Sequence, residues 1–171
     1  RLGPSDINKA KLVNYIDDYF LRIKKFIDSQ QIKYNLIHSN YWLSGIIGSR
    51  IAKYFNVSHF VTFHTFAQIK NRYLIDSDDA PSRLSNEMEL IVLADTIVCS
   101  SESEKKELLV FSKENDKKFY CIGAGVDVEK FSSMNQIESK EILQINNVRV
   151  ILFVGRIEPF KGIDLLIESI A

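Results

Sequence analysis

The sequence predicts an α/β fold with an open, doubly wound parallel sheet, and three observations lead to this prediction. Short runs rich in β-branched and aromatic residues alternate along the chain with amphipathic helical segments. One run, VRVILFV at 148–154, is almost wholly apolar, as in strands buried on both faces of a parallel sheet. The composition is globular, with 46% hydrophobic and 26% charged residues. Such alternation favours βαβ units with right-handed crossovers.

The first part of the chain contains two predicted helices and two predicted strands. Apolar residues at helical spacing predict helices over 5–29 and 43–55. Strands are predicted at 34–38 and 60–63, where β-branched and aromatic residues gather. Residues 65–82 have no clear periodicity and contain DSDDAP, so they predict a long loop. Loops of this length in compact domains usually have a function.

The second part continues the alternation. Ser101 and Glu104 form a capping box, which marks the start of one helix. The predicted helices cover 82–94, 101–111, 137–143 and 161–171. The predicted strands cover 96–99, 119–122 and 148–154. The polar stretch 132–147 predicts a domain boundary before the last strand.

Composition and charge exclude several classes of protein. Twenty-two basic and 22 acidic side chains give a net charge of zero, so no overall field attracts nucleic acid. Cys99 and Cys121 have neither metal-ligand spacing nor a disulfide framework, which suits a reducing cytoplasm. No apolar run has the length of a membrane helix, and no signal-peptide pattern is present. We therefore expect a cytoplasmic protein with small-molecule partners and no metal.

Three segments follow predicted strands, where open α/β sheets bind their ligands. They are HSNYWLSG at 38–45, HTFAQIKN at 64–71 and GRIEPFKG at 155–162. His38 and His64, each taken alone, also fit strand-end histidines whose ring nitrogens bond to the backbone.

The last of these segments has the residues that a diphosphate requires. Arg156 and Lys161 lie on a turn between Gly155 and Gly162, directly before a predicted helix. A solvated basic turn is the alternative interpretation. The glycine spacing excludes a Walker A loop, and GAG at 123–125 lacks the third glycine of a dinucleotide site. We expect no bound cofactor.

Taken together, these segments resemble the retaining glycosyltransferases of family 4, which have the GT-B fold of two Rossmann-like domains facing a cleft. The pair HSxYWxSG and HTxxxxKN most resembles the branch of sucrose-phosphate synthases and the mycothiol glycosyltransferase. The matching segments, in the family's order, are HSNYWLSG (38–45), VTFHTFAQIKN (61–71), PSRLSNEMEL with LADTIVCSSESEKKEL (81–108), IGAGVDVEKF (122–131) and LFVGRIEPFKGIDLLIESIA (152–171). Ala124 and Ser101 depart from the family's usual residues.

The resemblance implies a donor that is a nucleotide diphosphate sugar, a UDP-sugar, and a small hydroxyl acceptor such as a sugar phosphate or inositol phosphate. It implies that His64 lies beside the donor sugar, and that Arg156 and Lys161, with Gly155, hold the diphosphate and act in catalysis. Tyr41, Thr65 and Arg83 would bind the acceptor, Arg83 through a phosphate. The alternative for Arg83 is an ion pair with Glu87, four residues later in the same helix.

By the same resemblance, the chain corresponds to the middle of a two-domain enzyme. Residues 1–131 would form most of the acceptor-side domain, 132–147 a linker, and 148–171 the first strand and helix of the donor domain. We expect no turnover from the chain alone. The strand at 148–154 would lack its sheet, so it would pack on residues 1–131, associate with another copy or be mobile.

Two other functions remain open from the sequence. A non-catalytic module that binds sugar phosphates could keep the acceptor half of such an enzyme. A GT-B-like epimerase would also place a histidine in its cleft, although HSxYWxSG is not expected there.

Overall fold

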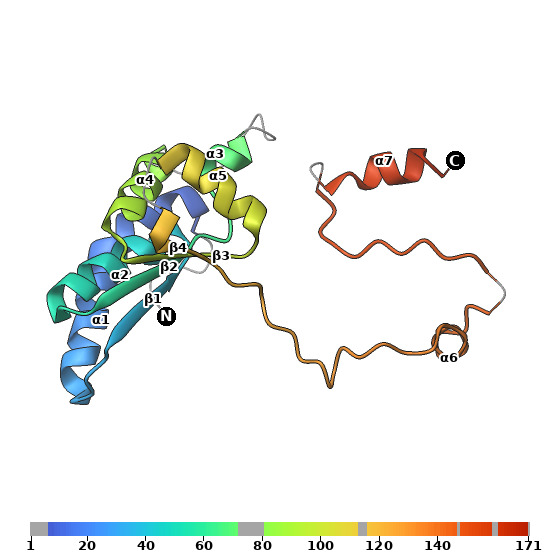
Figure 1. Cartoon of the computed structure of the whole chain (residues 1–171), viewed down its shortest axis with the longest axis horizontal. Helices are drawn as coiled ribbons and strands as arrows, with labels where there is room; N and C mark the ends of the chain where they lie inside the picture. The colour runs from blue at the N-terminus through green and yellow to red at the C-terminus, as the bar shows by residue number, and fades with distance from the viewer. Residues whose placement is uncertain (1–6, 72–80, 113–115, 147, 159–160, 171) are drawn as a thin grey trace. The chain divides into compact units, whose positions relative to one another are not determined.

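The computed structural model describes residues 7–71, 81–112, 116–146, 148–158 and 161–170 (Figure 1). The chain divides into two compact units, Arg1–Ala124 and Gly125–Ala171. Among the described residues no helix combines the length and the apolar character needed to cross a membrane. The assignment of the parts to an acceptor domain, a linker and a donor domain stays a prediction.

The first unit is built on a four-stranded parallel sheet in the order β1-β2-β3-β4. The strands are β1 (Leu36–Asn40), β2 (Ser58–Thr62), β3 (Thr96–Cys99) and β4 (Phe119–Cys121). The α/β class with a parallel sheet is therefore confirmed. Because each strand lies next to its predecessor, right-handed crossovers bring the connecting helices to one face of the sheet (Figure 1).

The helices follow the predicted periodicity with two differences. They are η1 (Lys9–Tyr15), α1 (Ile16–Gln30), α2 (Trp42–Phe55), α3 (Ala67–Asn71), α4 (Arg83–Leu93), α5 (Glu102–Ser112) and η2 (Asp116–Lys118). The first described helical segment is a 3₁₀ helix capped by the Asn8 side chain, and the predicted start at residues 5–6 lies outside the described residues. The prediction of a continuous loop over 65–82 is wrong at its beginning, where α3 forms. Residues 72–80 lie outside the described residues.

The core lies between the sheet and its connecting helices. Alternate strand residues such as Val61, Ile97 and Cys99 are fully buried, whereas their neighbours Phe60 and Val98 are only half-buried. This alternation indicates that one face of each strand packs against helices. The buried residues of the main cluster are Trp42, Val61, Phe63, Phe66, Leu90, Ile91, Ala94, Ile97, Cys99, Leu108 and Phe119.

Gly48 allows α2 to pack closely against β1 and β2. A Cβ atom at this position would lie 2.8 Å from His59 Nε2 and 3.3 Å from Ile37 Cγ2, and closer still to Ser39 Oγ. These neighbours are side chains of β1 and β2, two of them joined by a buried hydrogen bond, so they cannot move away freely.

We expect Gly48→Ala to lower the free energy of unfolding by about 2 kcal/mol, because the added methyl group overpacks this contact. Urea unfolding followed by the fluorescence of Trp42, the chain's single tryptophan, measures the change. Gly123→Ala is the matched control, since its Cβ meets nothing within 4 Å, and it should be neutral or slightly stabilising. Equal effects of the two substitutions would contradict this account of the packing.

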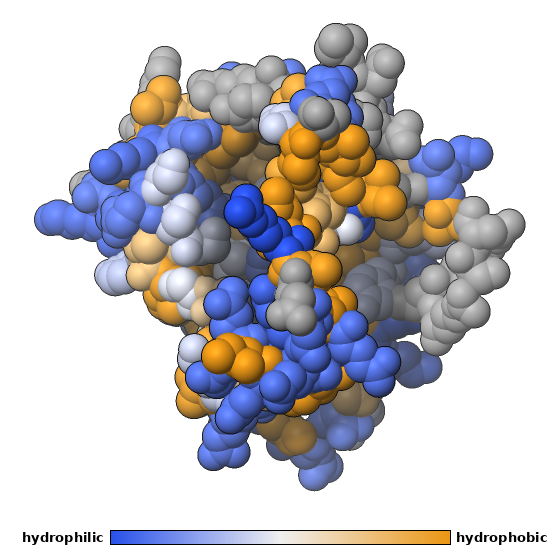
Figure 2. Space-filling model, turned by 90° about the vertical axis from the view of Figure 1, so that its right-hand side faces the viewer, coloured by the Kyte–Doolittle hydropathy of each residue, from blue (hydrophilic) through white to orange (hydrophobic). Residues whose placement is uncertain are grey.

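The described part of the second unit contains two short helices, α6 (Gln136–Ile142) and α7 (Ile163–Glu168). The predicted strand at 148–154 is wrong, because no strand forms at these residues. Leu152 and Val154 are 79% and 85% exposed. A parallel strand needs a neighbour for its hydrogen bonds, and the described part of this unit contains no other strand. Figure 2 shows the whole chain in space-filling form, with orange hydrophobic side chains exposed between blue hydrophilic ones.

Candidate functional site

The carboxyl ends of β1 and β2 lie side by side and carry the first two motifs of the sequence. The Tyr41 amide donates a 2.7 Å hydrogen bond to the Thr62 carbonyl, which joins the ends of the two strands. The register of the sheet pairs Asn40 with Thr62. The segment at 38–45 is thereby brought next to the segment at 64–71 at one edge of the sheet.

Two residues at this edge have positive φ angles without being glycine. Tyr41 has φ 74° and ψ 155°, a region that is almost confined to glycine, and His64 has φ 60°. Each such residue costs about 1–3 kcal/mol and persists only where its surroundings hold it. Residues of this kind concentrate at functional sites, so their occurrence together marks this edge as the candidate site.

The side chain of His64 is exposed and is oriented by a hydrogen bond. Its Nε2 lies 2.8 Å from Asn40 Oδ1, so in the neutral ring the proton is assigned to Nε2 and the lone pair to Nδ1. The ring of His38 makes a different contact, 2.9 Å from Nε2 to Thr62 Oγ1. His38 lies in the middle of β1 and not at a strand end, because the strand predicted at 34–38 forms two residues later, and His64 follows β2; the rings of both histidines bond to side chains.

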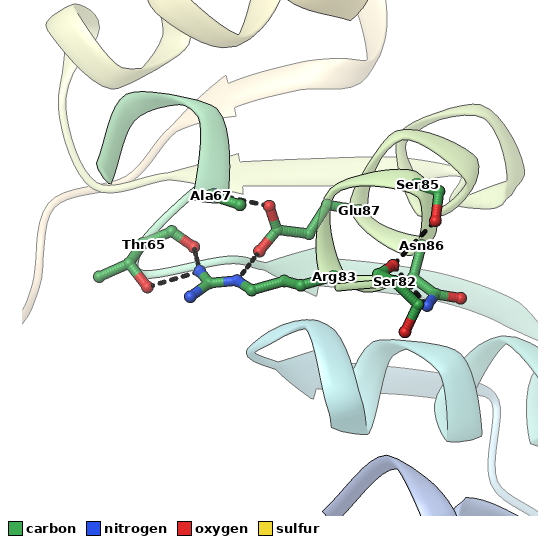
Figure 3. A network of polar contacts seen from close by, with 7 residues as sticks. All are labelled: Thr65, Ala67, Ser82, Arg83, Ser85, Asn86 and Glu87. Carbon is green, nitrogen blue, oxygen red and sulfur yellow. Dashed lines mark hydrogen bonds and ion pairs between the residues drawn. The ribbon is translucent and has the colours of Figure 1, made fainter. Parts of the chain in front are cut away.

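A buried ion pair lies behind the segment that follows β2. Arg83 and Glu87, on α4, are 1% and 0% exposed, and the Arg83 Nε donates to Glu87 Oε1 at 2.6 Å. The Arg83 Nη2 donates to the Thr65 carbonyl at 2.8 Å and to Thr65 Oγ1 at 3.0 Å. The amide of Ala67 donates to Glu87 Oε2 at 2.7 Å. Both charged side chains point from α4 towards Thr65 and Ala67 (Figure 3).

The same arginine also reaches Tyr41. Its Cζ atom lies 5.0 Å from the centroid of the Tyr41 ring, within the range of a cation–π interaction. Tyr41, Thr65 and Arg83, which the sequence places on three separate segments, therefore converge. The alternative expected for Arg83, an ion pair with Glu87, is also present.

A cavity of about 610 Å³ opens beside Tyr41. Its lining is mainly apolar and comes from η1, α1 and the start of α2, with Asn40 and Ser44 as polar members. Among the described residues no group of three or more His, Cys, Asp or Glu side chains could hold a metal ion.

The thiol of Cys99 is buried in β3. Burial raises the pKa of this thiol to about 12, so it is protonated at neutral pH.

The third motif lies in the second unit. Arg156 is 75% exposed in its side chain, and its Nη1 forms an ion pair with Glu158 Oε1 at 2.7 Å. The backbone amide of Lys161 donates to the Glu158 carbonyl at 2.9 Å, and Gly162 has φ 64° at the start of α7. Gly155, Arg156 and Lys161 are all exposed, so the described residues of this motif present two basic side chains to solvent.

The sequence profile of Glycosyltransferase Family 4 matches residues 6–130, which is most of the chain and includes the whole candidate site of the first unit. The chain belongs to Glycosyltransferase Family 4. The family expected from the motifs is thereby confirmed.

Relatives within the family agree with this assignment. The chain is 35% identical over 141 residues to a D-inositol 3-phosphate glycosyltransferase of Kribbella flavida, covering 81% of this chain and 33% of the relative. It is 30% identical over 176 residues to the enzyme of that name from Corynebacterium glutamicum, covering 99% of this chain and 42% of the relative. The chain spans between a third and about two fifths of the length of these relatives.

A solved structure has the same fold. Sucrose-phosphate synthase from Thermosynechococcus elongatus matches 99% of this chain with a TM-score of 0.86 and 25% identity, and the match covers 42% of that structure. The fold of this chain therefore matches part of a GT-B glycosyltransferase.

The sequence motifs did not identify two residues of the candidate site as functional. Asn40 was not singled out, although it lies inside the motif at 38–45, and Glu87 was named only as the partner of Arg83. The site roles predicted for His64, Tyr41, Thr65, Arg83, Gly155, Arg156 and Lys161 stay predictions for this family member.

Proposed function

We propose that the chain is part of a retaining glycosyltransferase, with residues 1–131 on the acceptor side and 148–171 on the donor side, and that this enzyme moves a sugar from a nucleotide diphosphate sugar to a hydroxyl group of a small phosphorylated acceptor. The observation that carries the proposal is the convergence of Arg83, Thr65 and Tyr41 at the carboxyl ends of β1 and β2. The names of the relatives, a D-inositol 3-phosphate glycosyltransferase and a sucrose-phosphate synthase, both include a phosphate and support this choice.

On the acceptor side, the positive charge of Arg83 attracts the acceptor phosphate, while its Nε and Nη2 donate to Glu87 and Thr65 and hold the guanidinium in place. The Thr65 hydroxyl and the Tyr41 ring lie against it and shape the same site. His64 is exposed two residues after β2, and its ring is held by Asn40, which suits a role beside the donor sugar.

On the donor side, Gly155, Arg156 and Lys161 hold the diphosphate of a UDP-sugar. Negative charge accumulates on this diphosphate as the glycosidic bond breaks, and the two basic side chains stabilise it electrostatically. The acceptor hydroxyl attacks the same face of the sugar, and the departing phosphate helps to remove its proton. No protein nucleophile takes part, and the chain without the rest of the donor site has no turnover.

The full-length enzyme should transfer sugar to inositol 3-phosphate with kcat/KM about tenfold to hundredfold higher than to inositol. The phosphate adds charge-assisted hydrogen bonds worth about 1.5–3 kcal/mol, while the ring and its hydroxyl groups are the same in both acceptors. Initial rates with a UDP-sugar, measured at saturating donor over a range of acceptor concentrations, give the ratio.

Equal kcat/KM for the two acceptors would disprove the role of the phosphate and leave the glycosyltransferase proposal standing. Absence of transfer from every nucleotide sugar, together with binding of the phosphorylated acceptor, would support the non-catalytic module instead. Conversion of the nucleotide sugar to its epimer without an acceptor would support an epimerase.

A further inference from the structure

Glu87 is a buried charge at the place where α4 meets the segment after β2. Its carboxylate is 0% exposed, and a buried charge is tolerated only if it is paired and hydrogen-bonded. Both oxygens are used: Oε1 accepts from Arg83 Nε at 2.6 Å, and Oε2 accepts from the Ala67 amide at 2.7 Å. One side chain thus joins α4 to the first residue of α3.

The connection continues through Arg83 to Thr65. The Arg83 Nη2 bonds to both the carbonyl and the hydroxyl of Thr65, so α4 holds the 64–67 segment at two points, Thr65 and Ala67. His64 precedes these anchors and has the strained φ of 60°. A strained residue of this kind needs such anchors in order to persist.

We infer that Glu87 is a positioning residue, which fixes the guanidinium of Arg83 and the 64–67 segment in the geometry that receives the acceptor. This inference rests on the proposed function, because that function makes Arg83, Thr65 and Tyr41 the acceptor site. Glu87 acts through Arg83 and Ala67. The competing explanation is that Glu87 only neutralises the charge of Arg83.

Two substitutions separate position from charge. Glu87→Gln removes the charge and replaces one of the two acceptor oxygens with an NH2 group, so either the Arg83 Nε or the Ala67 amide then faces another donor. Glu87→Asp keeps the charge but is one methylene shorter, so it cannot span both donors. If Glu87 positions the site, both variants of the full-length enzyme raise the acceptor KM about tenfold or more and leave the donor KM unchanged.

The competing explanations predict other results and would overturn the inference. Simple neutralisation predicts that Glu87→Gln lowers the KM for a phosphorylated acceptor, because Arg83 keeps an uncompensated charge, and that Glu87→Asp resembles the wild type. A purely structural role predicts a lower kcat, from a smaller folded fraction, at unchanged acceptor KM. Glu89→Gln is the matched control, since it removes one charge from an exposed position of the same helix, and it should leave both constants unchanged.

A third variant measures the coupling between Glu87 and Thr65 through the Arg83 guanidinium. Thr65 is exposed, and Thr65→Val removes only the hydroxyl that accepts from Arg83. It should raise the acceptor KM in the wild-type background and have a smaller effect in Glu87→Asp, because the two residues act through the same guanidinium. Full additivity of the two effects, or no effect of Thr65→Val, would overturn the inference.

Hydrogen exchange in the 171-residue chain tests the positioning without any enzyme activity. The Ala67 amide should exchange at least about tenfold faster in Glu87→Asp than in the wild type, whereas the Val61 amide at the centre of the sheet should not change. If the wild-type enzyme transfers no sugar, the proposed function fails while this measurement still decides whether Glu87 anchors the segment. Unchanged exchange at Ala67 would overturn the anchoring itself.

Discussion

Replacing Arg156 or Lys161 with alanine in the full-length enzyme is expected to lower kcat about a hundredfold and to weaken the apparent affinity for the donor. Each cation strengthens its contact as the leaving diphosphate gains negative charge, so its removal raises the barrier and not only the KM. Loss of one such preorganised group is worth about 3 kcal/mol. Steady-state rates at saturating donor and acceptor measure the effect on kcat.

Two further substitutions make this result specific. Lys161→Arg should restore only part of the rate, since a planar guanidinium does not replace a compact ammonium. Arg149→Ala removes an exposed cation of the same unit outside the motif and should leave kcat unchanged. This comparison separates a site effect from a change in overall charge.

His64→Ala should differ from Arg156→Ala and Lys161→Ala in its effect on nucleotide binding. On the proposed function its ring meets the sugar and not the phosphates, so the affinity for the free nucleoside diphosphate should stay at the wild-type value while kcat falls. If Arg156→Ala and Lys161→Ala instead keep the wild-type kcat and raise only KM, the two cations provide uniform binding, and their assignment to the transition state is wrong.

The parts of the fold that depend on local pattern could be predicted from the sequence. The strand at 96–99 and the helix opened by Ser101 and Glu104 form where their residues indicate, and the Glu104 amide does bond to Ser101 Oγ. These signals are contained in a few consecutive residues. The strand at 148–154 failed for the opposite reason, since a strand needs a partner that the described part of its unit does not supply.

In the candidate site too, residues within local motifs could be predicted from the sequence, whereas contacts between distant residues could not. The motifs identified Tyr41, His64, Thr65 and Arg83, because each follows a strand or lies in a family segment. The anchoring of Ala67 by Glu87 joins residues 20 positions apart, and no local pattern records it. The short helix α3 begins at that anchored amide, which explains why a stretch without periodicity did not predict it.

The strained backbone of the site was also hidden in the sequence. Positive φ angles are expected at glycine, yet here Tyr41 and His64 adopt them. Their conformations depend on tertiary contacts: the Tyr41 amide bonds to Thr62, and Arg83 lies against the Tyr41 ring. Such contacts become visible only once the strands are placed side by side.

Stability of the first unit should depend on pH through His59, a buried histidine under α2. Its side chain is 3% exposed, its Nε2 lies 2.9 Å from Ser39 Oγ, and its Nδ1 has no hydrogen-bond partner among the described residues. Burial lowers the pKa of His59 from 6.5 to about 4, although the nearby Asp95 carboxylate opposes this shift. A second proton on the ring would place a charge in this buried position and leave the Nδ1–H without an acceptor among the described residues.

The sign of the effect follows from proton binding. Between pH 6.5 and about 4 the unfolded chain protonates His59 while the folded chain keeps it neutral, so the unfolded state binds more protons. The free energy of unfolding should therefore fall as the pH drops through this window, by about 3 kcal/mol in total, and this contribution should level off below pH 4. Above pH 6.5 both states are neutral at this residue, and the contribution is complete.

Urea unfolding of the 171-residue chain at pH 7.5 and pH 4.5, followed by Trp42 fluorescence, measures this loss. His59→Gln keeps a group that can bond to Ser39 but takes up no proton in this range, so the difference between the two pH values should shrink by about 2 kcal/mol. His38→Gln removes an exposed histidine from the neighbouring strand and should leave most of the difference in place. If His59→Gln instead retains the full difference, the acid sensitivity comes from the carboxylates, and the buried histidine is not its source.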